Sequence, residues 1–346
     1  MRIVIAAGGT GGHLFPASVV KDELEKRGHE VFLITDSRGR HFAGGFARIS
    51  TITGGQWSGE GLWRRFKTLV RLGIGFLQSF YYMVRIRPHA VLGMGGYISV
   101  PVVLWGAILR KRTVIFNADA ILGNANILLA KFVDKVALAF DNTLLAPSEK
   151  SITTGLPIRK EILNAARLPY PQVKYKVIIT ILGGSQGAQI FSDIVPAALA
   201  KLKGIKVFHQ VIAEDLPRVA GFYKKHKIDA KVKSFFENPA KILRESHIFI
   251  GRAGANSVYE IGALGIPAIF VPIKHKDKQQ YLNAEKIAAR GGAVIIEQDR
   301  LSAQTLTSEL ARMIKTPNLL AQMAAHARII DIGNDAASNI ADLVEK

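Results

Sequence analysis

The chain has 346 residues, of which 49% are hydrophobic and 21% are charged. This length predicts two domains of ordinary size, and the composition excludes an intrinsically disordered chain. The absence of cysteine excludes disulfide bonds, thiolate metal sites and cysteine nucleophiles. Lysine and arginine outnumber acidic residues by 46 to 27, and the net charge of +19 favours nucleic acid, anionic lipid or phosphorylated ligands as partners.

Short β-branched runs alternate with helical stretches in the first half of the chain. The pattern predicts a helix over Pro16–Arg27 and strands over Arg2–Ala7, Val31–Thr35, Val91–Leu92, Thr113–Phe116 and Val136–Ala139. The first apolar run passes directly into glycines, so no signal peptide is expected. Pro88–Leu109 lacks formal charge over 22 residues, but its central glycines and Pro101 favour a strand, a turn and a helix over a membrane span.

Basic residues are concentrated in one part of this first half. Between Glu60 and Asp119 there is no acidic residue, and nine basic ones occur: Arg64, Arg65, Lys67, Arg71, Arg85, Arg87, Arg110, Lys111 and Arg112. The same segment has an apolar stripe at helical spacing: Phe66, Leu69, Val70, Gly73, Ile74, Leu77, Tyr81 and Val84. We expect this stripe to be buried by helix packing. The surrounding positive charge adds the hypothesis that the segment also contacts anionic lipid.

The alternation restarts after a cluster of prolines at Pro157, Pro169 and Pro171. Strands are expected over Val177–Leu182, Ile205–Val211, Ile248–Ile250, Ala268–Val271 and Ala293–Ile296. Strands that alternate with helices predict parallel sheets covered on both faces. We therefore expect an α/β protein with two Rossmann-like, doubly wound domains that face each other across a cleft. The expected domains are residues 1–157 and 158–329, with a C-terminal helix at about 330–346 packed back on the first.

A glycine-rich loop follows the first strand of each half, at Gly8–Gly12 and Gly183–Gly187. A glycine loop that leads into a helix offers backbone amides to phosphate. Neither loop has the dinucleotide-binding glycine pattern or a Walker lysine. Asp36 ends the second strand, where an NAD enzyme has its ribose-binding acid, so a nicotinamide oxidoreductase stays an alternative; capping a turn is the commoner role of such a residue.

Three separated motifs resemble the MurG family of bacterial peptidoglycan glycosyltransferases. The first is the loop Ala7–Ala17, which includes His13, and the second is Gly183–Ala188. The third and most specific is Arg252–Glu260, followed by Pro272–Asn283. The motifs are collinear with those of the family over nearly the whole chain. The resemblance implies the GT-B fold, with an acceptor-binding, membrane-side first domain and a UDP-sugar-binding second domain.

The resemblance also implies the reaction. N-acetylglucosamine would pass from UDP-N-acetylglucosamine to the muramyl sugar of an undecaprenyl-pyrophosphoryl muramyl-pentapeptide, with inversion, as a step of peptidoglycan synthesis. The expected enzyme is a hexosyltransferase that works without a metal ion or other cofactor. It would lie on the cytoplasmic face of the inner membrane as a peripheral protein, with an anionic membrane surface as partner and no nucleic acid.

Site residues follow from the same resemblance. His13 is the candidate general base or stabiliser of the reacting centre. Acceptor contacts are expected from Gly9, Thr10 and Tyr97. Donor contacts are expected from Thr10, Gly11, Gly12, Asp119, Arg159, Ser185, Phe236, Ala255, Asn256, Ser257, Val258, Tyr259, Glu260, Gln279 and Gln280, with Arg159 on the nucleotide, Phe236 by the uracil and Glu260 on the ribose hydroxyls.

The chain departs from the family pattern at three positions. Asp119 stands where the family has an asparagine that meets the sugar, Leu156 replaces a common asparagine, and Val100 replaces a small residue. Aspartate keeps the hydrogen-bond acceptor and loses the donor, which is expected to alter sugar binding. Nucleic-acid binding lacks a recognised module in the sequence. Closer alternatives are other GT-B enzymes, such as a lipid glycosyltransferase or a UDP-sugar epimerase.

Overall fold

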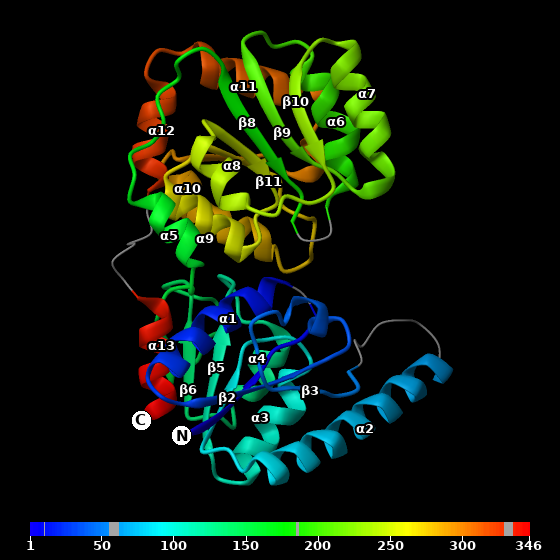
Figure 1. Ribbon diagram of the computed structural model, residues 1–346, viewed down its shortest axis with the longest axis vertical. Coiled ribbons are helices and arrows are strands. Elements are labelled where there is room, and N and C mark those ends of the chain that lie inside the picture. The colour runs from blue at the N-terminus through cyan, green and yellow to red at the C-terminus, as the bar shows by residue number, and fades with distance from the viewer. Residues whose placement is uncertain (10, 55–61, 185–186, 329–334) are drawn as a thin grey trace. The chain divides into compact units, whose positions relative to one another are not determined.

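The computed structural model describes residues 1–9, 11–54, 62–184, 187–328 and 335–346, without the side chains of 62–69. Contacts within the chain divide it into two compact units. Unit 1 comprises Met1–Arg159 and Asn334–Lys346, and unit 2 comprises Lys160–Gly333. Each unit is a parallel sheet with helices on its faces (Figure 1). The prediction of two Rossmann-like α/β domains is confirmed.

The sheet of unit 1 has seven strands in the order β3-β2-β1-β4-β5-β6-β7, all paired in parallel. Their bounds are β1 Arg2–Ala6, β2 Glu30–Thr35, β3 Ile49–Thr51, β4 Ala90–Gly93, β5 Arg112–Asn117, β6 Lys135–Leu138 and β7 Ser151–Thr153. The strand order reverses between β1 and β4. In doubly wound sheets such a switch point opens a crevice at the carboxyl ends of the strands, where ligands bind.

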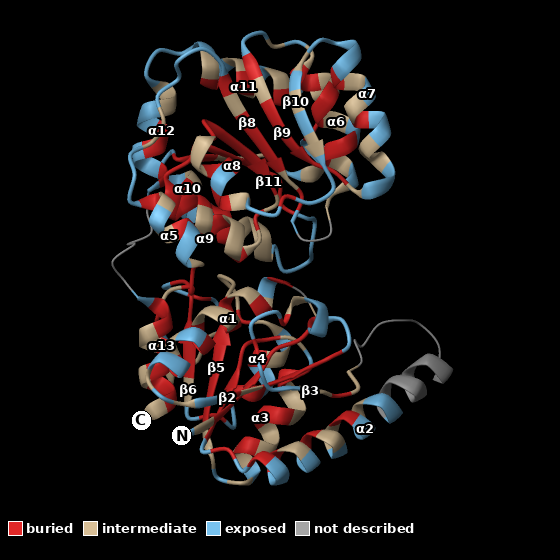
Figure 2. Cartoon of the chain, viewed as in Figure 1, coloured by how far each residue is buried: buried red, intermediate tan, exposed pale blue. Residues whose placement is uncertain are grey.

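Helices cover both faces of this sheet, and the strands between them form the core (Figure 2). They are α1 Gly11–Lys26, α2 Leu62–Ile86, α3 Ser99–Ile108, α4 Asn124–Leu129 and α13 Ala336–Glu345, with a 3-10 turn η1 at Gly39–Phe42. The C-terminal helix α13 packs on α1, where Arg27 Nη1 donates to Asp342 at 2.6 Å and to Glu345 at 2.9 Å. These ion pairs attach the end of the chain to unit 1.

Unit 2 has a six-stranded parallel sheet in the order β10-β9-β8-β11-β12-β13. Its strands are β8 Val177–Leu182, β9 Ile205–Gln210, β10 Asp229–Lys233, β11 Ile248–Gly251, β12 Ala268–Phe270 and β13 Ala293–Ile295. Its helices are α5 Lys160–Ala166, α6 Gln189–Leu199, α7 Leu216–Lys225, α8 Pro239–Glu245, α9 Ala255–Leu264, α10 Gln279–Ala289, α11 Ala303–Lys315 and α12 Leu319–Ala327, with 3-10 turns η2 Ala213–Asp215 and η3 Gln298–Arg300. The switch point lies between β8 and β11.

The sequence analysis missed β3, β7 and β10. All three are edge strands, and their residues are mostly exposed or half-buried. Such strands lack the continuous apolar run of a buried strand, so their sequences give little signal. The first helix begins at Gly11 rather than at Pro16, because Pro16 lies inside its second turn instead of at its start.

The apolar stripe of α2 is not buried, so the expectation of helix packing was wrong for its described members. Val70, Ile74, Leu77, Tyr81 and Val84 are exposed, and Leu77 retains 68% of its accessible surface. Phe66 and Leu69 lie outside the described side chains. The opposite face packs inward instead, through residues that include Gly75, Ser79 and Met83. A Cβ added at Gly75 would lie 2.2 Å from the Thr53 carbonyl oxygen, so glycine permits this close packing.

Candidate functional site

Two glycine turns pack together at the switch point of unit 1. Gly8 and Gly9 follow β1, and Gly95 and Gly96 follow β4. Both Gly95 and Gly96 have positive φ, at 99° and 79°, a conformation that other residues adopt at a cost. A Cβ added at Gly95 would lie 2.8 Å from Nδ1 of His13. The glycine therefore leaves room for the His13 ring against the turn after β4.

His13 lies in the first turn of α1 and is half-buried. Desolvation lowers the pKa of its imidazole below the ordinary value, and two smaller effects oppose this: the negative charge of Asp119 and a hydrogen bond with the Met94 backbone. The ring is consequently neutral at pH 7, which is the form that can accept a proton. Asp119 would stabilise the imidazolium that results.

Asp119 is held near this ring by a turn that begins at the end of β5. The Asn117 side-chain nitrogen donates to the carbonyl oxygens of Asp119 and Ile121, at 2.7 and 3.1 Å. The Asn117 side-chain oxygen accepts from the Gly123 amide and from the Asn126 side chain, each at 3.1 Å. Since Asn117 is buried, this network fixes the backbone that carries Asp119. The sequence analysis assigned Asp119 to the sugar, and the structure adds its interaction with His13.

The Asp36 carboxylate accepts hydrogen bonds from other residues of unit 1. Oδ1 accepts from the amides of Gly9 and Gly39, at 3.1 and 2.8 Å, and Oδ2 accepts from Arg38 at 3.2 Å. These bonds match the turn-capping role more closely than ribose binding. The Gly9 amide is thereby engaged by Asp36, so an acceptor contact through that amide would compete with this bond.

The remaining candidates of unit 1 surround the same edge. Gly11 is buried at the start of α1, Gly12 is exposed, and Tyr97 is exposed beside the turn after β4. Thr10 lies outside the described residues. Arg159, at the end of unit 1, holds its guanidinium 5.2 Å from the centre of the Phe15 ring on α1. This cation–π contact positions Arg159 within unit 1.

In unit 2 the carboxyl edge of the sheet carries the start of α9. Gly254 caps this helix without a side chain, so no cap side chain occupies the first amides. Ala255, Val258 and Tyr259 are buried, and Asn256, Ser257 and Glu260 are half-buried. The second group is the more accessible and can offer side chains as well as backbone amides to a ligand. Ser185, in the glycine loop after β8, lies outside the described residues.

Two glutamines begin α10 near the same edge. Gln279 and Gln280 are half-buried, and Oε1 of Gln280 accepts from the Ile273 amide at 3.1 Å. This bond orients the Gln280 side chain through its oxygen. The side-chain nitrogen takes no part in this bond. The buried Asn283 donates to the Ala253 carbonyl at 3.1 Å and so connects α10 to the loop before α9.

Phe236, the residue expected beside the uracil, lies in a small apolar cluster of unit 2. Its side chain is 7% exposed and packs with Phe208, edge to face at 6.3 Å, and with Ile242. The neighbouring Phe235 is 66% exposed.

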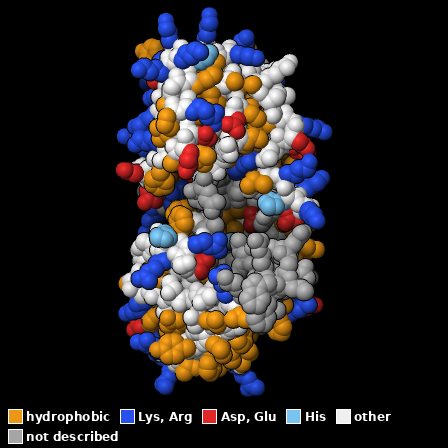
Figure 3. All heavy atoms as spheres, turned by 90° about the vertical axis from the view of Figure 1, so that its right-hand side faces the viewer, with side chains coloured by type: hydrophobic (Ala, Val, Ile, Leu, Met, Phe, Trp, Pro, Cys, Tyr) orange, Lys and Arg blue, Asp and Glu red, His pale blue; other side chains and the backbone are white. Residues whose placement is uncertain are grey.

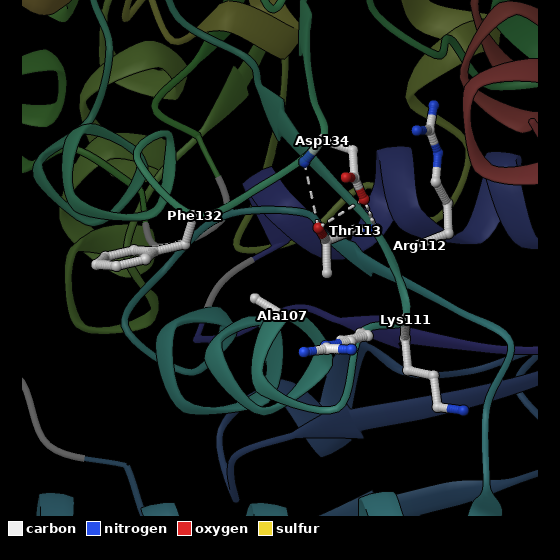
Figure 4. A pocket seen from close by; sticks show the side chains of 7 residues that line it. Ala107, Lys111, Arg112, Thr113, Phe132 and Asp134 are labelled. Atoms are coloured by element: carbon white, nitrogen blue, oxygen red, sulfur yellow. Dashed lines mark hydrogen bonds between the residues drawn. The ribbon is translucent and has the colours of Figure 1, made fainter.

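A shallow basic pocket of about 460 Å³ lies at the amino end of the unit 1 sheet, away from the glycine turns (Figure 4). It is lined by Ala107, Arg110, Lys111, Arg112, Thr113, Phe132 and Asp134. The Asp134 carboxylate is engaged by the Thr113 amide and hydroxyl, at 2.7 and 3.0 Å. Three basic residues against one carboxylate give this pocket a net positive charge. Among the described residues, no cluster of His, Asp or Glu is suited to a metal ion.

Three residues of these edges were not singled out from the sequence: Asn117, Arg38 and Asn283. Asn117 and Asn283 each donate a side-chain hydrogen bond to a backbone carbonyl, and Arg38 donates to the carboxylate of Asp36. The position of Asn117 at the end of a strand was the available signal for the first. Arg38 follows Asp36 by two residues, and no pattern in the sequence indicates on which side of the loop it lies.

Comparison with known proteins places these features in a family. The chain matches the glycosyltransferase family 28 N-terminal domain over residues 3–138 and the glycosyltransferase family 28 C-terminal domain over 178–344. It is 37% identical to the UDP-N-acetylglucosamine–N-acetylmuramyl-(pentapeptide) pyrophosphoryl-undecaprenol N-acetylglucosamine transferase of Rhodospirillum rubrum, over 99% of this chain and 91% of that relative.

Solved structures agree with the sequence comparison. The crystal structure of Acinetobacter baumannii MurG matches with a TM-score of 0.80 and 28% identity, over 99% of both chains. The UDP-GlcNAc 2-epimerase of Neisseria meningitidis matches with a TM-score of 0.69 over 100% of both chains. Its 13% identity shows a shared fold alone.

Proposed function

Since the chain belongs to the MurG family within glycosyltransferase family 28, we propose that it transfers N-acetylglucosamine from UDP-N-acetylglucosamine to an undecaprenyl-pyrophosphoryl muramyl-pentapeptide. The relatives carry this activity in their names and align over nearly the full chain. The observation in this chain that supports it most is the shielded imidazole of His13 at the switch point of unit 1.

The proposed reaction needs one proton acceptor. A hydroxyl of the muramyl sugar attacks the anomeric carbon of the donor and gives its proton to the neutral His13 imidazole. The bond from that carbon to the UDP oxygen breaks, and UDP leaves with the bonding electron pair. Attack from the side opposite the leaving group inverts the anomeric centre. Asp119 stabilises the positive charge that His13 gains.

Unit 2 is the proposed donor domain. The first amides of α9, which follow the N-cap Gly254, suit the negative charge that develops on the departing diphosphate. Glu260, on the same helix, offers two oxygens to the vicinal hydroxyls of the ribose. The amides of Gln279 and Gln280 suit sugar hydroxyls, which both donate and accept. The Ser185 loop of unit 2 and, from the end of unit 1, Arg159 complete this assignment as inferred from the family.

Product analysis tests this proposal against the closest alternative. Incubation with UDP-N-acetylglucosamine and a soluble lipid-linked muramyl-pentapeptide is expected to give UDP and a lipid-linked disaccharide with a β-linkage. A UDP-sugar epimerase needs no acceptor and would change the sugar without such a product. Conversion that is independent of the acceptor would therefore contradict the transferase assignment.

We also propose that unit 1 binds an anionic membrane surface, where its lipid acceptor resides. Hydrophobic side chains gather at the lower end of unit 1, with lysine and arginine at the margin (Figure 3). The exposed stripe of α2, together with Ile108 and Phe132, supplies apolar surface. Arg85 on α2, and Arg110 and Lys111 shortly after Ile108, supply positive charge. No helix in the described parts of the chain is long and apolar enough to cross a membrane.

Liposome sedimentation tests the membrane proposal. The protein is expected to pellet with anionic but not with neutral vesicles, and salt is expected to release it. Leu77→Gln removes an exposed apolar side chain and should reduce pelleting. Tyr175→Ser is a matched control, because Tyr175 is 94% exposed in unit 2. Absence of binding to anionic vesicles at low salt would contradict the proposal. The proposed location is the cytoplasmic face of the inner membrane, with the protein bound peripherally.

A further inference from the structure

An arginine lies against the first glycine turn of unit 1. Arg38 follows β2, which pairs with β1, so the ends of both strands lie at the same edge of the sheet. The Arg38 Nη2 atom lies 3.4 Å from the position that a Cβ of Gly9 would occupy. Gly9 has a φ of 77°. The absence of a side chain at Gly9 therefore lets the guanidinium come close to the turn.

Asp36 holds this arginine in place. Its Oδ2 accepts from both Nε and Nη2 of Arg38, each at 3.2 Å, while Oδ1 accepts from the amides of Gly9 and Gly39. One buried carboxylate thus fixes the turn and the guanidinium together. A guanidinium has five N–H donors, and the two bonds to Asp36 leave donors for a ligand. The Arg38 side chain is 57% exposed, so these donors are accessible.

The arrangement suits a diphosphate. A buried carboxylate beneath the turn would repel an anion, and the adjacent guanidinium offsets that charge. Arginine also binds phosphate oxygens in a two-pronged geometry, which gives orientation as well as attraction. The acceptor diphosphate is attached directly to the sugar whose hydroxyl reacts. A group that binds it must therefore lie near the proton acceptor, and His13 is in the helix that this turn begins.

We propose that Arg38 binds the diphosphate of the lipid-linked acceptor, with Asp36 as its positioning residue. This inference rests on the proposed function for the identity of the acceptor. It assigns Arg38 to the acceptor rather than to UDP-N-acetylglucosamine because the guanidinium lies against Gly9, a residue expected to contact the acceptor.

Arg38→Gln tests the assignment. The KM for the acceptor is expected to rise about tenfold or more, as for the loss of a hydrogen bond to a charged group, with the KM for UDP-N-acetylglucosamine within twofold of wild type. Arg40→Gln is the matched control, because it removes the same charge from an exposed residue of the same turn. An equal rise in both KM values, or an unchanged acceptor KM, would overturn the proposal.

A double variant separates ligand binding from simple neutralisation of Asp36. Asp36→Asn keeps an oxygen for the Gly9 and Gly39 amides but removes the charge. If Arg38 served only to neutralise Asp36, adding Asp36→Asn to Arg38→Gln would restore the acceptor KM. The proposal predicts that the KM stays high. Thermal unfolding of all variants shows whether the turn has been disrupted, and restored binding in the double variant would overturn the proposal.

A binding measurement keeps this inference distinct from the proposed function. The probe is farnesyl diphosphate, compared with farnesyl monophosphate, titrated into wild type and Arg38→Gln. Tighter binding of the diphosphate by wild type, lost in the variant, supports the assignment even if no sugar transfer occurs. Equal binding of both probes by both proteins would overturn it, whether or not the protein is active as a transferase.

Discussion

The two units present different chemical groups at equivalent edges of similar sheets. In unit 1 the described residues that gather there include an imidazole, two carboxylates and a guanidinium: His13, Asp36, Asp119 and Arg38. In unit 2 they include the first amides of α9, the side-chain amides of Gln279 and Gln280, the Ser257 hydroxyl and Glu260, and the loop between β12 and α10 adds the exposed Lys274, His275 and Asp277. The Arg252 guanidinium of unit 2 is engaged by the Val271 carbonyl and lies over the Phe191 ring.

This difference indicates a division of work between two copies of one architecture. An edge with coupled charges can move a proton and hold an anionic acceptor. The amides of α9 and the side chains of Gln279 and Gln280 can bind a nucleotide sugar without exchanging protons with it. Substitutions of His13 and Asp119 in unit 1 should therefore affect turnover and its pH dependence, whereas substitution of Glu260 in unit 2 should affect donor affinity.

The largest expected effect is on turnover, in His13→Ala. Loss of the proton acceptor should lower kcat by about 100- to 10,000-fold, as for other general bases, with little change in the KM for UDP-N-acetylglucosamine. Steady-state kinetics with saturating acceptor measure both values. His41→Ala, at an exposed histidine of unit 1, serves as the control. A kcat within a few-fold of wild type would show that another group takes the proton.

Glu260→Ala should abolish the preference of unit 2 for ribose over 2′-deoxyribose in the nucleotide. Wild type is expected to bind UDP more tightly than 2′-deoxy-UDP, because one hydroxyl contact to the carboxylate is missing in the second ligand. In the variant the two affinities should become similar, with a loss of about tenfold for UDP. Competition assays measure both ligands. A preference for UDP that survives the substitution would remove Glu260 from the ribose site.

Asp119→Asn tests, through the pH dependence of the reaction, whether Asp119 acts on His13. The Asp119 carboxylate raises the pKa of His13, so its removal should lower that pKa further. The base must be unprotonated to act. The acidic limb of the profile of kcat/KM against pH should therefore move to lower pH, and a several-fold fall in kcat is expected from the weaker base. An unchanged acidic limb would mean that Asp119 does not act on His13 in the working enzyme.

The smallest expected effect concerns stability and a histidine that lies in the core of unit 2. His209 is buried, its Nδ1 lies 2.9 Å from the Tyr223 hydroxyl oxygen, and desolvation lowers its pKa to about 3. The unfolded chain binds an extra proton between that value and about 6.5. The free energy of unfolding should therefore decrease as the pH is lowered through this window, by at most about 1.4 kcal/mol per pH unit from this group.

Denaturant unfolding at several pH values checks this slope. His209→Gln removes the titrating group and should flatten the pH dependence in that window, even if the variant is less stable throughout. His326→Gln, at an exposed histidine of the same unit, should keep the wild-type slope. Identical slopes in all three proteins would contradict the assignment to His209.

The sequence predicted the central strands well, because a strand covered on both faces is a nearly continuous apolar run. Val177–Leu182 matches β8 throughout. It did not predict the outward stripe of α2, since an exposed apolar face has the same periodicity as a buried one. The tight approach of Gly75 to Thr53 decides which face packs, and that depends on tertiary structure.

Candidate site residues followed a similar rule. Loops at strand ends, such as the one that carries His13, were predictable from order and from family resemblance. The interaction between His13 and Asp119 was not, because it joins the ends of strands far apart in the chain. The capping role of Asp36 could be stated in advance, but the position of Arg38 over Gly9 depends on the conformation of the turn.

Calorimetric titration of UDP-N-acetylglucosamine into wild type, His13→Ala and Glu260→Ala tests the division of work most directly. The account predicts that His13→Ala binds the donor as tightly as wild type, although it no longer transfers the sugar, and that Glu260→Ala binds it about tenfold more weakly. Donor binding that is lost in His13→Ala and kept in Glu260→Ala would contradict the account.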